Sequence, residues 1–141
     1  MSRVYWDTML FIYLLEGHPR YSLRVQHLLA RAAERKDSLY TSHLALGEIM
    51  VGAGPLPDTQ KQEMIRNTLD EMGFRFLPFD EGAVLPFSRL RAKEKLKVAD
   101  AIHLACAASA GIDLFLTGDK QLQKLHVPGV QFIANFDTSL L

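Results

Sequence analysis

Cysteine and net charge are both scarce in this sequence. Cys106 is the single cysteine among 141 residues, which excludes an internal disulfide framework and a cysteine-based zinc site. Such cysteine usage fits a reducing compartment, and we expect a cytoplasmic protein. Lys and Arg number 16 and Asp and Glu number 16, for a formal net charge of +0. Bulk charge therefore does not indicate a polyanion partner, and any attraction for one has to be local.

Long hydrophobic runs are missing as well. The longest run, residues 9–15, is far shorter than the roughly 20 residues of a membrane-spanning helix. It is a poor signal peptide, because Asp7 precedes it and Glu-Gly-His-Pro follows where small residues should mark cleavage. We expect no membrane segment and no export signal. With 48% hydrophobic residues, the chain is long enough to bury its own core, and we predict a single domain over residues 1–141.

Short aromatic or β-branched segments alternate with helical patterns along the chain. We predict strands over residues 3–6, 38–41, 74–79, 114–117 and, more weakly, 130–133. Helices are expected over residues 9–15, 21–35, 43–51, 58–72, the region after Asp80, and 98–110. This alternation predicts βαβ units and a three-layer α/β/α fold with a parallel sheet of four to five strands.

Individual residues refine the predicted elements. Ser42 is expected to cap the helix over 43–51, which Gly52, Gly54 and Pro55 would end. Pro78 indicates that the third strand lies at a sheet edge, and Pro86 predicts a kink or break in the helix after Asp80. The apolar residues that we expect the helix over 58–72 to bury are Met64, Ile65, Leu69 and Met72.

Four acidic residues lie where predicted strands end or predicted helices begin. These residues are Asp7, Glu48, Asp100 and Asp119. In open parallel sheets ligands bind beyond the carboxyl ends of the strands, so we expect the four carboxylates to face one crevice. Taken singly, three of them have ordinary alternatives as a helix cap, a complement to the helix dipole and a turn residue. Glu48 lies among apolar residues, where an unpaired carboxylate is costly.

Clustered carboxylates need a physical explanation, because like charges repel and raise each other's pKa. A bound divalent cation removes this conflict, and a set of oxygen ligands suits Mg²⁺ or Mn²⁺ rather than zinc. Such ions commonly orient phosphates and activate water for in-line attack. The pattern therefore predicts metal-dependent cleavage of phosphodiester bonds.

Four stretches of the sequence resemble motifs of the PIN-domain nucleases, in particular the small toxins of the VapC type. They are VYWDT (4–8), SHLALGE (42–48), ADAIHLA (99–105) and LTGD (116–119). The resemblance implies a five-stranded sheet in the order 3-2-1-4-5 and an acidic site to which Thr117 adds a hydroxyl. It also implies a single-stranded RNA substrate, Mg²⁺ or Mn²⁺, a homodimer and a small antitoxin partner. Met9 departs from the polar residue that many members carry after Asp-Thr.

Basic residues precede Asp100 in the sequence. On one continuous helix, Arg89, Lys93 and Lys97 would share a side at four-residue steps, with Arg91 nearby. This stripe could guide an RNA backbone toward the acidic crevice. An ordinary solvated helix face explains the same pattern equally well.

Other reactive or aromatic residues are interpreted as structural. His103 follows Asp100 by three residues and is expected to be a hydrogen-bonded packing residue, although a ligand or general base is conceivable. An alanine-rich surround argues against a reactive Cys106 thiol. Aromatic residues near the start of the chain are expected to build the core and dimer contacts; these are Tyr5, Trp6, Phe11 and Tyr13.

The combined hypothesis is a Mg²⁺- or Mn²⁺-dependent endoribonuclease, the toxin of a type II toxin–antitoxin pair. Asp7, Asp100 and Asp119 are expected to hold the cation directly or through water. Glu48 would complete the shell and orient or deprotonate the attacking water, and Thr117 would hydrogen-bond a carboxylate or a metal-bound water. Two alternatives stay open: a non-catalytic RNA-binding or regulatory module on the same fold, and a phosphotransfer domain that uses Asp7.

Overall fold

Strands and helices alternate along the chain as the sequence predicted. The computed structural model describes residues 1–52 and 57–138. Its elements are β1 (Arg3–Trp6), α1 (Thr8–Leu15), α2 (Ser22–Arg35), β2 (Ser38–Ser42), α3 (His43–Val51), α4 (Asp58–Glu71), β3 (Phe74–Leu77), α5 (Glu81–Lys93), α6 (Val98–Ser109), β4 (Leu114–Thr117), the 3₁₀ helix η1 (Leu122–Lys124) and β5 (Phe132–Asn135). No helix within these residues has the length and hydropathy to cross a membrane.

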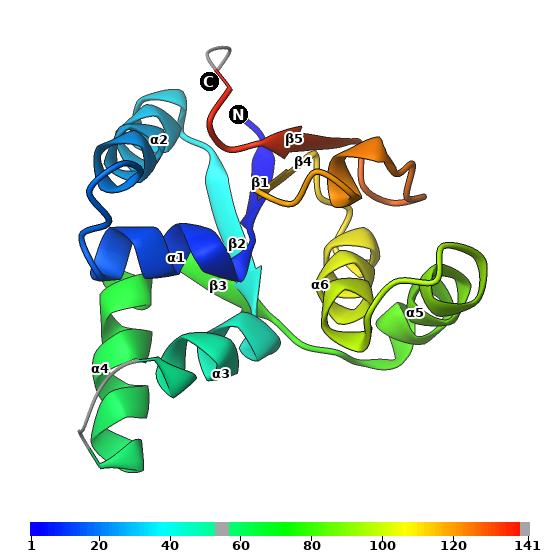
Figure 1. Cartoon of the computed structure of the whole chain (residues 1–141), viewed down its shortest axis with the longest axis horizontal. Helices are drawn as coiled ribbons and strands as arrows, with labels where there is room; N and C mark the ends of the chain where they lie inside the picture. The colour runs from blue at the N-terminus through cyan, green and yellow to red at the C-terminus, as the bar shows by residue number, and fades with distance from the viewer. Residues whose placement is uncertain (53–56, 139–141) are drawn as a thin grey trace.

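The central sheet has five strands in the order β3-β2-β1-β4-β5, and every neighbouring pair is parallel (Figure 1). Tyr5 of β1 pairs with Tyr40 of β2 on one side and with Phe115 of β4 on the other. Strand order reverses at β1, which makes the carboxyl ends of β1 and β4 the expected ligand site. The predicted order is confirmed, and β3 lies at an edge, as Pro78 indicated.

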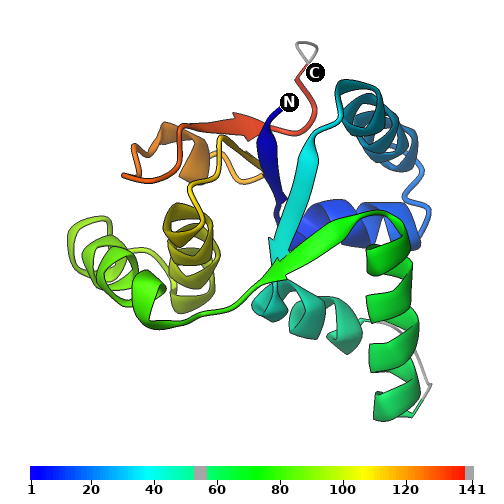
Figure 2. The same cartoon turned by 180° about the vertical axis from the view of Figure 1, so that it is seen from behind.

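Side chains of β1 alternate between the two faces of the sheet. Val4 and Trp6 face a core shared with α1, α2, α3 and α4, whereas Tyr5 faces a second core shared with α5 and α6. Figures 1 and 2 show α1, α2 and α4 on one side of the sheet and α5 and α6 on the other. Because both faces are covered by helices, the fold is the predicted three-layer α/β/α arrangement.

Polar side chains cap helices α3 and α5, and the predicted cap at Ser42 is confirmed. Ser42 ends β2 in extended conformation, and its Oγ accepts the backbone N–H of Ala45 at 3.2 Å. Asp80 caps α5 through the N–H of Gly82 at 3.2 Å. Each cap satisfies a backbone donor that the first turn leaves free. Gly54 and Pro55, predicted to help end α3, lie outside the described residues.

Several details of the sequence prediction differ from the structure; among them, β3 ends at Leu77, two residues before the predicted end at residue 79. Met64 is 48% exposed, because α4 buries only the stripe that contains Ile65 and Leu69. Of the predicted kink or break at Pro86, the break does not occur, because helix α5 runs from Glu81 to Lys93 through the proline. The proline removes the helical bond to the carbonyl of Gly82, which is exposed to solvent. Strand β5 begins and ends two residues later than predicted, at Phe132–Asn135, where it pairs with β4.

The basic stripe expected on one helix is divided between two elements. Helix α5 ends at Lys93, and the chain turns through Lys95 in the left-handed region, with φ 55°. Lys97 then occupies the N-cap position of α6. Arg89 and Lys93 therefore share a helix, but Lys97 does not lie on it. The four-residue spacing alone could not reveal this turn.

Candidate active site

A cleft of about 580 Å³ lies at the carboxyl edge of the sheet, where the strand order reverses. Its walls include the side chains of four acidic residues from separate segments: Asp7, Glu48, Asp100 and Asp119. Asp7 directly follows β1 and Asp119 lies just beyond β4, and these two strands are neighbours. The structure thus brings these four residues together at one crevice.

Asp7 caps helix α1 and also lines the cleft. Its backbone is extended, and Oδ1 accepts the N–H of Thr8 at 2.8 Å, capping α1. Oδ2 accepts a hydrogen bond from the hydroxyl of Thr117 at 2.7 Å. Thr117 is fully buried, and its Oγ1 also accepts the N–H of Asp119 at 3.1 Å. The buried hydroxyl of Thr117 thus connects the two segments that carry Asp7 and Asp119.

Asp100 lies in the first turn of α6 and is half-buried. Burial raises its pKa above the ordinary value, and the negative charges of Asp119 and Asp7 raise it further. His103 and Lys97 act in the opposite direction, with smaller effects. Asp7 and Asp119 are therefore close enough to Asp100 to oppose its ionisation, which supports a shared site.

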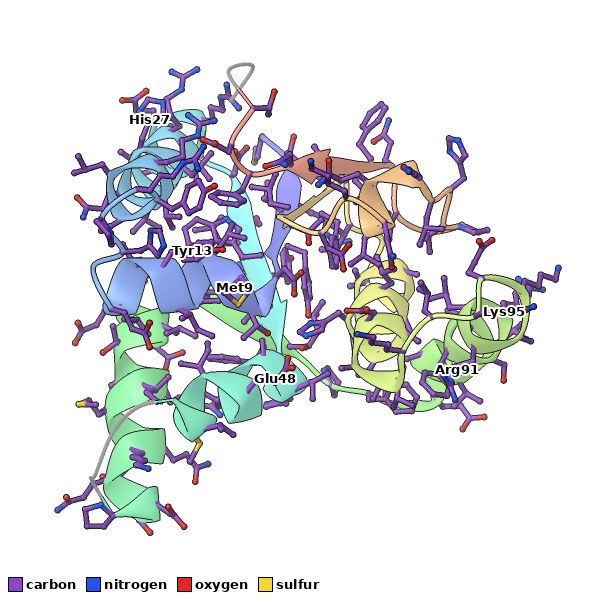
Figure 3. All side chains as sticks on the ribbon, in the orientation of Figure 1. Met9, Tyr13, His27, Glu48, Arg91 and Lys95 are labelled. Carbon is purple, nitrogen blue, oxygen red and sulfur yellow. The ribbon has the colours of Figure 1, made fainter. Side chains whose placement is uncertain are left out.

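Glu48 has the opposite electrostatic environment. His103 Nε2 lies 2.7 Å from its Oε1, and the Thr8 hydroxyl donates to the same oxygen at 2.8 Å. The hydrogen bond with His103 lowers the pKa of Glu48, and Thr8 adds to this effect against the influence of burial. Figure 3 shows Glu48 on α3 beside the end of α1 that carries Met9. Glu48 is thus held as a carboxylate at the rim of the cleft.

Sequence reasoning did not assign Thr8 and His103 to the site. His103 is buried and hydrogen-bonded, as expected of a packing residue, but it also contacts Glu48 and lies 3.8 Å from Oδ1 of Asp7. Its spacing of three residues from Asp100 was the available signal. Thr8 follows Asp7 directly, and nothing in the local sequence shows that its side chain reaches Glu48 on α3.

Most of the basic residues lie away from the acidic cleft. Arg91 donates to the carbonyl of Leu96 at 2.7 Å, which holds the turn between α5 and α6. Arg89 and Lys93 line a separate pocket of about 270 Å³. Figure 3 shows α5, with Arg91 labelled, on the far side of α6 from Glu48. Lys97 is the member of this set whose charge acts on Asp100.

The oxygen-rich cleft suits a hard divalent cation by its chemistry. In residues 1–52 and 57–138, however, no group of three or more His, Cys, Asp or Glu side chains is arranged to hold a metal ion as it stands. Both oxygens of Asp7 already accept hydrogen bonds. The side chains that could hold such a cation, directly or through water, are Asp7, Glu48, Asp100 and Asp119.

Cys106 lies on α6 but is no candidate nucleophile. The thiol is buried, and burial, with a smaller contribution from the charge of Asp80, raises its pKa to about 11. A thiol in this environment stays protonated near neutral pH and is unreactive. The predicted inert character of Cys106 agrees with this environment.

Comparisons with known proteins agree with the fold. The family model described as PIN domain matches residues 4–127. The comparison with curated proteins found no match. Among solved structures, one similar structure is VapBC2 from Rickettsia felis bound to a DNA fragment from its promoter. The TM-score is 0.69 and the sequence identity 17%, and the match covers 95% of this chain and 98% of that chain.

Two further solved structures share the architecture. A toxin–antitoxin complex from Klebsiella pneumoniae is similar with a TM-score of 0.61 and 24% identity, over 90% of this chain and 94% of that chain. VapBC-5 from Mycobacterium tuberculosis, a member of the VapBC family of toxin–antitoxin systems, is similar with a TM-score of 0.50 and 21% identity. The match covers 70% of this chain and 82% of that chain. These likenesses concern the fold, whereas the family model spans most of the sequence. The chain is therefore a member of the PIN domain family.

Proposed function

We propose that this chain is an endoribonuclease that hydrolyses RNA phosphodiester bonds with Mg²⁺ or Mn²⁺, and that it is the toxin of a type II toxin–antitoxin pair. The observation that carries the proposal is the convergence of Asp7, Glu48, Asp100 and Asp119 on one cleft. Asp100 ionises less readily because of burial and its two acidic neighbours. A partly buried set of like charges is costly unless a cation binds there.

Each site residue has a proposed role. Asp7, Asp100 and Asp119 hold the cation, directly or through water. When bound, the cation neutralises charge on the scissile phosphate and activates water for attack. Glu48 completes the shell of the cation and orients the attacking water, because its carboxylate is fixed by Thr8 and His103. Thr117 keeps Asp7 facing the cleft.

Features of the cleft wall suit single-stranded RNA. Met9, Ile12 and Tyr13 line the same cleft as the carboxylates, and apolar or aromatic side chains are the surfaces on which unpaired bases pack. Lys97 supplies positive charge near Asp100, where it would attract the RNA backbone. We propose Lys97 as the nearest RNA-binding residue, with Arg89, Arg91 and Lys93 as more distant ones.

The proposed protein partners rest on the relatives and on one apolar groove. One of the similar structures is described as a toxin–antitoxin complex, another as a member of the VapBC family of toxin–antitoxin systems, and a third as VapBC2 bound to a DNA fragment from its promoter. A groove of about 430 Å³ between α1, α3 and α4 is lined by residues that include the exposed Leu15 and Met64. An apolar groove between helices suits an amphipathic segment of a partner. We propose an antitoxin as that partner, a homodimer as the assembly, and the cytoplasm as the compartment.

The experiment that tests the proposed function incubates purified protein with labelled RNAs in Mg²⁺, Mn²⁺ or a chelator. Cleavage by the wild-type protein should need the cation and should be abolished in Asp7→Asn. RNA binding that falls steeply with salt, without metal-stimulated cleavage, would instead indicate the non-catalytic RNA-binding module. Labelling of Asp7 by acetyl phosphate, without RNA cleavage, would indicate the phosphotransfer alternative.

A further inference from the structure

A buried chain of hydrogen bonds runs from the core to the acidic cleft. The hydroxyl of Tyr5 on β1 lies 2.8 Å from Oγ of Ser42 and 2.7 Å from Nδ1 of His103. The other ring nitrogen of His103, Nε2, lies 2.7 Å from Oε1 of Glu48. Tyr5, Ser42 and His103 are all buried, at 0%, 0% and 3% exposure. This chain joins β1, the end of β2, α6 and α3 behind the cleft.

The chemistry of the partners places the hydrogen of the imidazole. An ionised carboxylate can only accept hydrogen bonds, so the 2.7 Å contact with Glu48 requires a hydrogen on Nε2 of His103. In the neutral ring, Nδ1 is then an acceptor, and the hydroxyl of Tyr5 can donate to it. Tyr5 has a single hydroxyl hydrogen, so when it donates to Nδ1 the 2.8 Å contact with Ser42 has to be made by the Ser42 hydroxyl and no longer by that of Tyr5. In this arrangement every hydroxyl donates in the direction of the cleft.

Hydrogen bonds to Glu48 are concentrated on one oxygen. His103 and Thr8 both contact Oε1, while Oε2 has no hydrogen bond to any residue that the structure describes. The Glu48 side chain is 37% exposed. The contacts therefore hold Oε1 of the carboxylate and leave Oε2 available to a cation or water in the cleft.

We propose that His103 is a positioning residue for Glu48, and that Tyr5 supports the tautomer that donates from Nε2. The lowered pKa of Glu48, caused first by His103, agrees with this geometry. The catalytic consequence rests on the proposed nuclease function. Outer partners of this kind usually change metal affinity or activity by about 10–100-fold when they are removed. A histidine that only fills space would have no such effect.

The first test needs neither metal nor RNA. Long-range ¹H–¹⁵N NMR spectra of the metal-free protein distinguish the two imidazole tautomers, and His103→Gln identifies the His103 signal among the five histidines. The wild-type spectrum should show a hydrogen on Nε2 of His103. Tyr5→Phe keeps the ring stacked on Phe115 at 4.8 Å but removes the hydrogen bond to Nδ1, so the Nδ1 resonance of His103 should shift while the hydrogen stays on Nε2. A His103 hydrogen on Nδ1 alone, or a Tyr5→Phe spectrum identical to wild type, would overturn the proposal.

The second test compares Mn²⁺ affinity, kcat and KM among folded variants. His103→Leu should lower Mn²⁺ affinity and kcat about 10–100-fold, with little change in KM for RNA. His103→Gln keeps a side-chain N–H donor and should recover most of the loss. Cys106→Ala is the matched control, because Cys106 is buried on the same helix and its thiol makes no hydrogen bond to the cleft carboxylates within the described chain.

The outcomes separate positioning from packing and from the proposed function. Equal losses in His103→Gln and His103→Leu, or wild-type values in His103→Leu, would overturn the positioning role. If His103→Leu does not fold in a thermal-unfolding measurement, Tyr5→Phe replaces it, with a smaller loss expected in the same direction. A wild-type protein that cleaves no RNA would refute the nuclease, while the tautomer measurement would still decide the proposed role of His103.

Discussion

The hydroxyl of Thr117, at the end of β4, donates a 2.7 Å hydrogen bond to Oδ2 of Asp7, at the end of β1. The same oxygen of Thr117 accepts the N–H of Asp119. Neighbouring strands β1 and β4 therefore end in two acidic residues that lie close together. The buried Thr117 hydroxyl binds the side chain of Asp7 and the backbone of Asp119. The relationship explains why a threonine precedes Gly118-Asp119 at this position.

Replacing Thr117 by valine keeps the shape of the side chain but removes the hydroxyl. We expect a loss of about 1–3 kcal/mol in the free energy of unfolding, because a mostly buried carboxylate loses a hydrogen bond. Thr117→Ser keeps the hydroxyl and is the matched control. Urea denaturation of both variants measures the difference, and equal stability of the two would contradict this role of Thr117.

Asp100→Asn should stabilise the protein near neutral pH. The pKa of Asp100 is raised in the folded state by burial and by Asp119 and Asp7, so the folded protein binds this proton more readily than the unfolded chain. Stability therefore falls as pH rises through the window above the ordinary pKa of an aspartate. The gain in Asp100→Asn should be less than about 1 kcal/mol, because solvent screens a partly exposed group.

The measurement is the unfolding free energy of wild type and Asp100→Asn across a pH series. The advantage of Asp100→Asn should disappear at pH values below the ordinary aspartate pKa, where wild-type Asp100 is protonated in both states. Asp70→Asn, at an exposed position on α4, is the control and should show no such trend. A destabilised Asp100→Asn at neutral pH would refute the proposed repulsion.

Glu48→Gln should lower the free energy of unfolding near neutral pH, whereas Asp100→Asn should raise it. The pKa of Glu48 is lowered in the folded state, first by the hydrogen bond with His103. The stabilisation is present above the ordinary pKa of a glutamate and is lost as pH falls through the lower folded value. We expect Glu48→Gln to be less stable than wild type at neutral pH by no more than about 1 kcal/mol, since the side chain is partly exposed.

A pH series again provides the test of Glu48. The difference between wild type and Glu48→Gln should shrink in acid, whereas the exposed Glu63→Gln on α4 should match wild type throughout. Stabilisation by Glu48→Gln at neutral pH would mean that His103 and Thr8 do not favour the carboxylate.

Lys97 should contribute more to RNA binding than Lys93. Its charge acts on Asp100 at the cleft, whereas Lys93 lines a different pocket. In a chelator, which prevents metal-dependent cleavage, Lys97→Gln should weaken binding of single-stranded RNA. It should also reduce the slope of log affinity against log salt by about 0.7, the value for one phosphate contact. A larger effect of Lys93→Gln would place the RNA path on α5 instead.

The fold could be predicted largely from local patterns. β1 and β4 have the predicted bounds, because short β-branched and aromatic segments end at clear turn residues. The register of β5 could not be predicted, since it depends on pairing with β4 and not on its own residues. Met64 was wrongly expected to be buried, because a 3.6-residue period does not show how wide a stripe the neighbours cover.

The acidic residues could be found from the sequence, because they end strands or begin helices at one edge of a parallel sheet. The hydrogen bonds that hold them could not. Tyr5 reads as a core aromatic residue, and only the fold brings its hydroxyl to His103. Similarly, the turn at Lys95, with φ 55°, separates Lys97 from the helix that carries Arg89 and Lys93. Such contacts between distant segments leave no local signal.

The most direct test of the shared acidic site is a calorimetric titration of the purified protein with Mn²⁺. The wild-type protein should bind the ion, and Asp7→Asn and Asp119→Asn should each lower the affinity by at least about tenfold. Asp70→Asn, on the exposed surface of α4, should bind as wild type does. Unchanged Mn²⁺ affinity in Asp7→Asn and Asp119→Asn would contradict the claim that these carboxylates form one cation site.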